Sequence, residues 1–139
     1  MQYLHGGDLI ARQVAAQGVT AIYGQCGGHI APIFNSCADN GIALIDVRHE
    51  QAAGHAADAH ARLTRNIGVA VVTAGPGVTD AVTAVANAYH ARSPLILIGG
   101  AAPLHTRGQG ALQEMPQTEM FQTFTKASFH HRQHRRYSG

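Results

Sequence analysis

Three ionisable residues stand together at Arg48-His49-Glu50, directly after the apolar run 42–47 and before the Ala-rich segment 51–64. A carboxylate at a helix N-terminus is favoured in its charged form by the helix dipole, whereas burial opposes that charge. Glu50 can therefore cap a helix or act on a ligand, and the residue types alone leave both interpretations open. The functional interpretation gains weight because ligands bind beyond the carboxyl ends of parallel strands.

Two glycine-rich loops are the other candidates for ligand contact: Gly24-Gln-Cys-Gly-Gly-His29 and Thr73-Ala-Gly-Pro-Gly-Val-Thr-Asp80. Glycine lets backbone approach a ligand closely, and a helix that follows offers free N–H groups. Neither loop is a dinucleotide fingerprint, because Asp80 takes the last glycine position of the second loop and would repel a phosphate. The first loop is a tight turn or a ligand loop; the second predicts a rigid turn with close backbone approach.

The histidines do not predict a folded metal site. His49, His55 and His60 are spaced 6 and 5 residues apart, which turns them to different faces of a helix. Most of the ten histidines are interpreted as structural or solvent-facing. A flexible C-terminal cluster, made of His130, His131 and His134, would bind a metal only weakly.

The two cysteines predict no redox or metal function. Cys26 and Cys37 are eleven residues apart and form neither a CxxC motif nor a disulfide framework. In a chain without an export signal they are expected to be reduced thiols. A Ser-His-Asp arrangement and a nucleophile elbow are also absent from the sequence. Nucleophilic catalysis by the protein's own side chains is therefore not predicted.

The elements that must position these loops alternate along the chain. Short apolar runs predict strands buried on both faces, at residues 19–23, 42–47, 69–73 and 95–98. Ala-rich segments of helical length separate them, at residues 8–17, 28–40, 50–64 and 77–91. This order predicts an α/β fold, a doubly wound parallel sheet with helices on both faces.

The C-terminal part follows a different pattern. Residues 99–110 predict a loop rich in Gly, Ala, Pro and His, and a second loop surrounds Gln113-Glu-Met-Pro116. Met120, Phe121 and Phe124 predict one or two turns of amphipathic helix. We therefore expect one domain over residues 1–128, possessing a C-terminus that is incomplete for its fold, and a disordered His/Arg-rich tail over 129–139.

Composition narrows the class of protein. The chain has 139 residues, of which 45% are hydrophobic and 13% charged. Residues 1–128 carry seven Lys/Arg and eight Asp/Glu, a net charge of −1, while the last eleven residues add +3. The basic charge thus belongs to the tail, and neither nucleic acid nor membrane is predicted as a partner. With no export signal at the N-terminus, a cytoplasmic protein is expected.

Several separated motifs together resemble one family, the thiamine diphosphate-dependent enzymes. The first set comprises Gly-x-x-Gly-Gly-His-Ile-Ala-Pro-Ile-Phe at 24–34, Asp-Val-Arg-His-Glu-Gln-Ala-Ala at 46–53 and Ala-Ala-Asp-Ala-x-Ala-Arg-Leu at 56–63. The second set is residues 69–79, 93–98 and 113–117. Within the family the chain is most similar to the acetolactate synthase and 2-hydroxyacyl-CoA lyase group. The resemblance covers about residues 4–128 and concerns the N-terminal pyrimidine-binding domain only.

The resemblance implies specific roles. Glu50 would be the catalytic carboxylate that hydrogen-bonds N1′ of the cofactor's aminopyrimidine and so promotes ylide formation at the thiazolium. The loop beside the pyrimidine would be Gly75, Pro76, Gly77 and Thr79. Facing the substrate would be Gly27 and Gly28, and Gln113 would lie near the active-site entrance. No residue is assigned as a metal ligand, and proton transfer is assigned to neither His29 nor His49.

Two departures from the family pattern stand at the candidate site. Cys26 replaces the usual Pro of the first loop, and Asp80 replaces the usual Asn. Asp80 would put a second negative charge near Glu50 and repel it.

The resemblance also implies that a second domain is needed to complete the cofactor site. The Gly-Asp-Gly…Asn-Asn signature, which in the family holds Mg²⁺ and the diphosphate, is absent from the sequence. The implied partner is a diphosphate-binding domain or subunit of the same enzyme, in a full-length form that is a homo-oligomer. FAD, which some family members use, is not indicated.

Three interpretations remain open from the sequence. The chain is the pyrimidine-binding part of a carboligase or lyase acting on 2-keto acids or 2-hydroxyacyl-CoA, or it is a catalytically inactive truncated remnant. The third is an independent α/β module that binds small molecules, which the motif set argues against. The tail favours truncation over a natural split subunit. In the first two cases the isolated chain is expected to be inactive.

Overall fold

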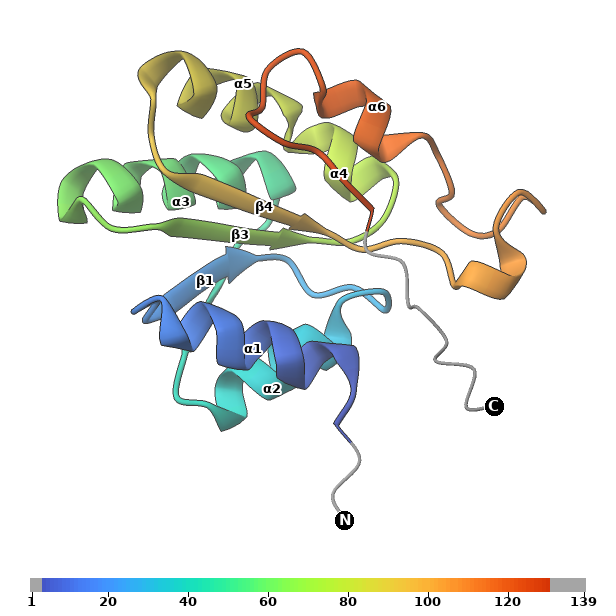
Figure 1. The fold of residues 1–139 in the computed structure, drawn as a ribbon, viewed down its shortest axis with the longest axis horizontal. Coiled ribbons are helices and arrows are strands. Elements are labelled where there is room, and N and C mark those ends of the chain that lie inside the picture. The colour runs from blue at the N-terminus through green and yellow to red at the C-terminus, as the bar shows by residue number, and fades with distance from the viewer. Residues whose placement is uncertain (1–3, 131–139) are drawn as a thin grey trace, which may run out of the picture.

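The computed structural model describes residues 4–130 and contains one parallel sheet of four strands in the order β2-β1-β3-β4 (Figure 1). The strands are β1 (Ala21–Gly24), β2 (Ala43–Asp46), β3 (Gly68–Val72) and β4 (Leu95–Gly99). All three strand pairs are parallel, and β3 pairs with β4 along its whole length. The predicted parallel sheet is confirmed.

Helices cover the two faces of the sheet as predicted (Figure 1). One face carries α1 (Gly6–Ala16) and α2 (Ala31–Asp39). The other carries α3 (Glu50–Thr64), α4 (Pro76–Asp80) and α5 (Val82–Ala91), and α6 (Gln117–Phe121) lies beside α4. β3 supplies both cores, because its side chains alternate: Val69 and Val71 join the α1/α2 core, while Ala70 and Val72 join the α3/α5 core.

The prediction of strands buried on both faces is correct for β3 and wrong for β2. All five residues of β3 are buried, whereas all four residues of β2 are exposed. β2 is an edge strand that contacts β1 and α2, while α3 lies over β1 and β3. The other edge strand, β4, is intermediate, and its Ile96 is 42% exposed. An apolar run thus predicts a strand but does not predict its place in the sheet.

Three of the predicted helices, α1, α2 and the segment 77–91, differ in extent from the predictions. The segment predicted as one helix at 77–91 is divided into α4 and α5 at Ala81, where the backbone N–H of Ala81 bonds to Val78 O. The helix predicted at 28–40 begins three residues later, because Gly27 O accepts from the N–H groups of Ile30 and Ala31 in a turn. The loops predicted at 99–110 and 113–116 are present, the first containing a 3₁₀ turn at Leu104–Thr106.

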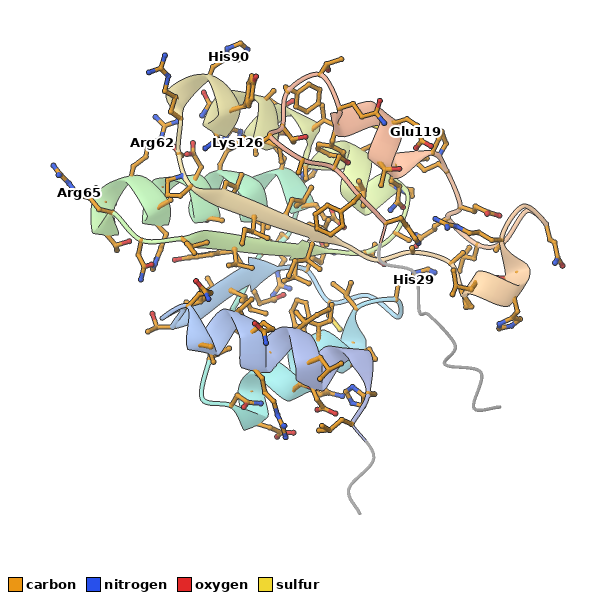
Figure 2. The ribbon with its side chains drawn as sticks, in the orientation of Figure 1. His29, Arg62, Arg65, His90, Glu119 and Lys126 are labelled. Atoms are coloured by element: carbon orange, nitrogen blue, oxygen red, sulfur yellow. The ribbon has the colours of Figure 1, made fainter. Side chains whose placement is uncertain are left out.

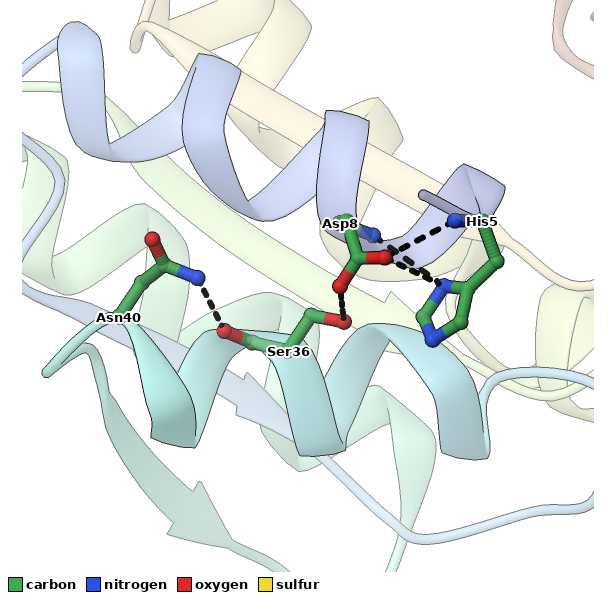
Figure 3. Close-up of polar contacts among 4 residues, drawn as sticks. All are labelled: His5, Asp8, Ser36 and Asn40. Carbon is green, nitrogen blue, oxygen red and sulfur yellow. Dashed lines mark hydrogen bonds and ion pairs between the residues drawn. The ribbon is translucent and has the colours of Figure 1, made fainter. Parts of the chain in front are cut away.

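A hydrogen-bonded group fixes the start of α1 and its packing on α2 (Figure 3). His5 Nδ1 accepts from Asp8 N at 3.3 Å and Asp8 Oδ2 accepts from His5 N at 2.9 Å, a capping box with histidine as the cap. Ser36 Oγ, from α2, donates to Asp8 Oδ1 at 2.8 Å. The hydrogen bonds from the His5 backbone and from Ser36 lower the pKa of Asp8. The cap explains why α1 begins two residues before the predicted helix.

A second polar group, centred on Asp58, ties α3 to α5. Asp58 is 3% exposed and accepts two hydrogen bonds from Arg62, at 3.0 and 2.7 Å, and a third from Asn87 of α5 at 2.9 Å. Arg62, labelled in Figure 2, also donates to Ser93 Oγ, just before β4. Burial alone would raise the pKa of Asp58, but these hydrogen bonds outweigh it and hold the pKa below its usual value.

The C-terminal part is anchored by aromatic packing. The predicted amphipathic turn is α6, and its Phe121 is buried against the α3/α5 core with Phe124 in edge-to-face contact. The tail predicted to be disordered, 129–139, lies outside the described residues except for its first two positions. Within 4–130, no helix combines the length and apolar character that crossing a membrane requires. Both cysteines are free thiols, Cys26 exposed and Cys37 buried, as expected.

We predict that Asp58→Asn lowers the free energy of unfolding at pH 7 by roughly 1.5–3 kcal/mol, the usual range for hydrogen bonds to a charged group. Folding lowers the pKa of Asp58. The stabilisation that ionised Asp58 gives the folded protein is therefore present above its ordinary pKa of 3.8 and is lost as the pH falls through the lower, folded-state pKa. The difference between the wild type and the variant should therefore narrow below pH 3.8. Urea unfolding at a series of pH values measures it.

Asp39→Asn is the matched control for this experiment. Asp39 is an exposed aspartate at the end of α2, and its substitution should change the free energy of unfolding by no more than about 0.5 kcal/mol. Asp8 is present in all three proteins, so its own pH dependence cancels in the comparison. If the free energy of unfolding lost in Asp58→Asn stayed constant down to the lowest pH, the charge of Asp58 would not be what stabilises the α3/α5 pair.

Candidate functional site

The candidate residues meet where the sheet topology reverses. The chain passes from β1 outward to β2 and then returns to β3 on the other side of β1, so the switch point lies between β1 and β3. In an open parallel sheet, ligands bind in the crevice outside the carboxyl ends of the strands at such a point. The loops after β1 and β3 and the start of α3 stand at this edge, on the side toward which the strand arrows of Figure 1 point.

Glu50 is the first residue of α3 and is half-buried. The preceding His49 caps the helix, with its Nδ1 accepting from Gln51 N at 3.1 Å, so capping does not require Glu50. Gly77 of α4 lies beside the carboxylate: a Cβ at that position would be 3.1 Å from Glu50 Oε1 and 2.8 Å from Thr73 Cγ2. The space next to the Glu50 carboxylate thus depends on a residue without a side chain.

The two glycines of the first loop have different environments. A Cβ on Gly27 would lie 2.6 Å from Thr73 Cβ and Oγ1, whereas a Cβ on Gly28 would meet nothing within 4 Å. Thr73 therefore lies between Gly27 and Gly77 and joins the loops that follow β1 and β3. His29 Nδ1 lies 3.3 Å from Thr73 Oγ1, and Figure 2 shows His29 at the same edge of the sheet.

The remaining predicted residues surround Gly75. Gly75 has a φ of 61° and is buried, and Pro76 begins α4 as an exposed residue. Thr79 Oγ1 donates to Pro76 O at 2.9 Å, which stiffens this single turn of helix. Gln113, at a φ of 62°, lies against the loop: a Cβ on Gly75 would be 2.5 Å from Gln113 O. The structure thus brings all the predicted site residues to one edge, with Gln113 in contact through its backbone.

Asp80 lies near Glu50, as the sequence predicted. One side-chain atom each from His49, Glu50 and Asp80 fall within 4.8 Å of one another, and His49 Nε2 is 3.9 Å from Asp80 Oδ2. This geometry has room for a cation. Because His49 Nδ1 accepts the Gln51 N–H, however, the neutral ring carries its proton on Nε2 and has no lone pair to offer there. The arrangement instead places the Nε2–H of the ring beside Asp80.

Sequence reasoning missed two residues of this edge. Thr73 opens the second glycine-rich loop, but the sequence assigned it no role, although its contacts join Gly27, Gly77 and His29. Gln117, the first residue of α6, accepts from Gly75 N at 2.6 Å and donates to Gly100 O at 2.9 Å. Nothing in the spacing of residues 113–117 distinguishes Gln117 from Gln113, because the hydrogen bonds join segments that are 17 and 42 residues apart.

A cavity of about 360 Å³ opens beside His29. Its other lining residues come from the segment after β4, and they are Pro103, Thr106, Gln109, Ala111 and Leu112. The cavity therefore adjoins the loop that contains Gly27 and Gly28. An apolar lining with a few polar groups is typical of small-molecule sites.

Known proteins are similar to this chain over most of its length. Residues 4–120 match the family described as thiamine pyrophosphate enzyme, N-terminal TPP binding domain. The chain is 52% identical over 122 residues to 2-hydroxyacyl-CoA lyase 2 of Caenorhabditis elegans, and 48% identical over 122 residues to the human protein of that name. It is 46% identical over 114 residues to the acetolactate synthase large subunit of Mycobacterium tuberculosis.

These matches cover most of this chain but little of the relatives. They span 88% of the chain and 19% of each of the two lyases, and 82% of the chain and 21% of the synthase. The chain thus corresponds to about one fifth of each relative. The residues that match the family, 4–120, include every residue of the candidate site.

We predict that Gly27→Ala lowers the free energy of unfolding by roughly 1–3 kcal/mol, the usual cost of forcing a methyl group into filled space. The new Cβ would overlap Thr73, whose branched side chain cannot turn away freely. Gly28→Ala is the control, one residue away and in open space, and should change it by less than about 0.5 kcal/mol. Equal effects of the two substitutions in thermal unfolding would contradict the assigned packing of this loop.

Proposed function

Because the chain belongs to the thiamine pyrophosphate enzymes, as their N-terminal TPP binding domain, we propose that Glu50 and the loop Gly75-Pro76-Gly77 hold the aminopyrimidine of thiamine diphosphate. The observation that carries the proposal is the space beside the Glu50 carboxylate, which a Cβ at residue 77 would fill. A half-buried carboxylate next to backbone that carries no side chain suits a flat heteroaromatic ring. The Glu50 carboxylate and the glycine backbone beside it thus fit this cofactor.

The proposed roles follow from the positions of the side chains. Glu50 holds a proton at the ring nitrogen N1′ from its position in the first turn of α3. Gly75, Pro76, Gly77 and Thr79 form the wall beside the ring, and Thr79 stiffens it through its bond to Pro76 O. The cofactor, when bound, supplies a carbon nucleophile for attack on a carbonyl. The protein's part is to orient and polarise it.

Gly27 and Gly28 form the substrate side of the site. Gly27 is fixed against Thr73, while Gly28 leaves open space next to His29 and the cavity of about 360 Å³. The relatives' names point to 2-hydroxyacyl-CoA or to the 2-keto acids of acetolactate synthesis as the substrate class. We propose that the reaction is that of a carbon–carbon lyase or carboligase of this family.

The proposed site is one half of a complete site. The chain matches 19–21% of its relatives, and it contains no Gly-Asp-Gly…Asn-Asn string. The partner we propose is a diphosphate-binding domain or subunit that supplies the Mg²⁺ ligands, in a homo-oligomeric full-length enzyme. Without that partner, the pyrimidine contacts alone are too few for tight binding.

We predict that the chain alone binds thiamine diphosphate with Mg²⁺ no better than millimolar, and micromolar once a partner bearing the missing domains is added. The remaining domains of the Caenorhabditis elegans lyase are a suitable partner, given 52% identity in this part. Isothermal titration calorimetry measures both affinities. Micromolar binding by the chain alone would contradict the half-site proposal, and no gain with the partner would favour an inactive remnant.

We predict that Glu50→Gln slows hydrogen exchange at C2 of the bound cofactor by roughly 10²- to 10⁴-fold, the usual contribution of a general acid–base group. Exchange is measured by quenched NMR in the assembly with the partner. Glu119→Gln, which neutralises an exposed carboxylate of α6, should leave exchange unchanged. Thermal unfolding should differ little, since a charge in the first helical turn is worth about 0.3–1 kcal/mol. Wild-type exchange in Glu50→Gln would overturn the role of Glu50.

A further inference from the structure

We propose that Gln117 is a positioning residue that holds the loop Gly75-Pro76-Gly77 in register with Glu50. The proposal rests on the function proposed above and extends it to a residue of the segment 113–117 to which the sequence assigned no role. Gln117 is the first residue of α6 and is partly buried. Its carboxamide makes two hydrogen bonds at once, accepting from Gly75 N at 2.6 Å and donating to Gly100 O at 2.9 Å.

These two bonds close a ring of hydrogen bonds around the carboxyl ends of β3 and β4. Gly100 N donates to Val72 O at 2.9 Å, which extends the pairing of the two strands by one step. Gly100 O then accepts from Gln117, and Gln117 accepts from Gly75, three residues after Val72. The path returns to the strand from which it started. A single side chain thus fixes the position of the loop after β3 relative to β4.

Only a carboxamide of this length can make both contacts. Gly75 N is a donor and Gly100 O is an acceptor, so the bridging group must accept at one end and donate at the other. A carboxylate can accept from Gly75 but cannot donate to Gly100. An asparagine has the right groups but is one methylene shorter. The requirement for glutamine is thus chemical as well as steric.

The loop that Gln117 holds leaves little tolerance for movement. Gly75 is pressed against the Gln113 backbone, and a Cβ on Gly100 would lie 2.6 Å from His29 Cβ. Two residues after Gly75, the backbone of Gly77 lies beside Glu50 Oε1. A shift of the Gly75 end of α4 therefore changes the space next to the carboxylate. This is how Gln117 acts on the site without touching a ligand.

The test uses three substitutions in the full chain. Gln117→Leu removes both bonds at nearly constant volume, and Gln117→Glu keeps only the acceptor. Gln122→Leu, at the exposed C-cap of the same helix, is the matched control. The first readout is amide hydrogen exchange of Gly75 and of Gly77 in the free chain, measured by NMR. The second is the dissociation constant of thiamine diphosphate with Mg²⁺ in the assembly with the partner domains.

We expect Gln117→Leu to speed exchange at Gly75 about tenfold, as the loss of one hydrogen bond predicts. It should weaken cofactor binding by a similar factor while the core amides of β3 keep their protection. Gln117→Glu should preserve protection at Gly75 but still weaken binding, because the link to Gly100 is lost. The control should match the wild type in both readouts.

Two results would overturn the proposal. One is unchanged Gly75 exchange and unchanged cofactor affinity in Gln117→Leu. The other is a uniform loss of protection across β3 and the loop, which would make Gln117 a residue of general stability only. Failure of the proposed function gives a different result: Gly75 exchange responds to Gln117→Leu, but neither the wild type nor any variant gains cofactor affinity with the partner.

Discussion

The space beside the Glu50 carboxylate depends on close backbone contact between loops that follow different strands. Gly27 lies against Thr73, Gly77 lies against both Thr73 and Glu50, and Gly75 lies against Gln113. Each contact is short enough that a Cβ would overlap the neighbouring atoms. Side chains at these positions would either fill the space or push the loops apart. The candidate site therefore depends on positions without side chains, where the backbone of one loop lies close to another loop and to the Glu50 carboxylate.

This arrangement requires that the elements behind the loops do not move relative to one another. The α3/α5 pair is fixed by Asp58, which takes hydrogen bonds from both helices, and α1 is fixed to α2 through Asp8 and Ser36. β3 joins the two cores by alternating its side chains between them. Because β3 also leads directly into Thr73 and Gly75, the best-buried strand carries the loop with the tightest contacts. The buried strand therefore restrains the site residues, because only a few residues separate them from β3.

The sequence predicted most of this, for reasons that differ from one feature to the next. Short apolar runs located the four strands, and Ala-rich segments of helical length located the helices, because elements that pack into a core are rich in apolar residues. It did not show that β2 is exposed, since strand order is set by contacts far apart in the chain. The motifs brought Glu50 and the glycines to one edge but could not separate Gly27 from Gly28, which differ only in what faces them. Gln117 belongs to the matched segment 113–117, but its role could not be predicted, because its hydrogen-bond partners lie 17 and 42 residues away.

Asp80 adds a charge that the site must accommodate. An aspartate within 4.8 Å of Glu50 would oppose a second negative charge there, yet His49 faces it at 3.9 Å. The histidine is oriented by its own role as helix cap, which directs Nε2 and its proton toward Asp80. One ring thus caps α3 and faces Asp80, immediately before the residue proposed to act on the cofactor. The Asp80 and Glu50 carboxylates nevertheless stay within 4.8 Å of each other, so the like charge of Asp80 is a constraint on the role proposed for Glu50.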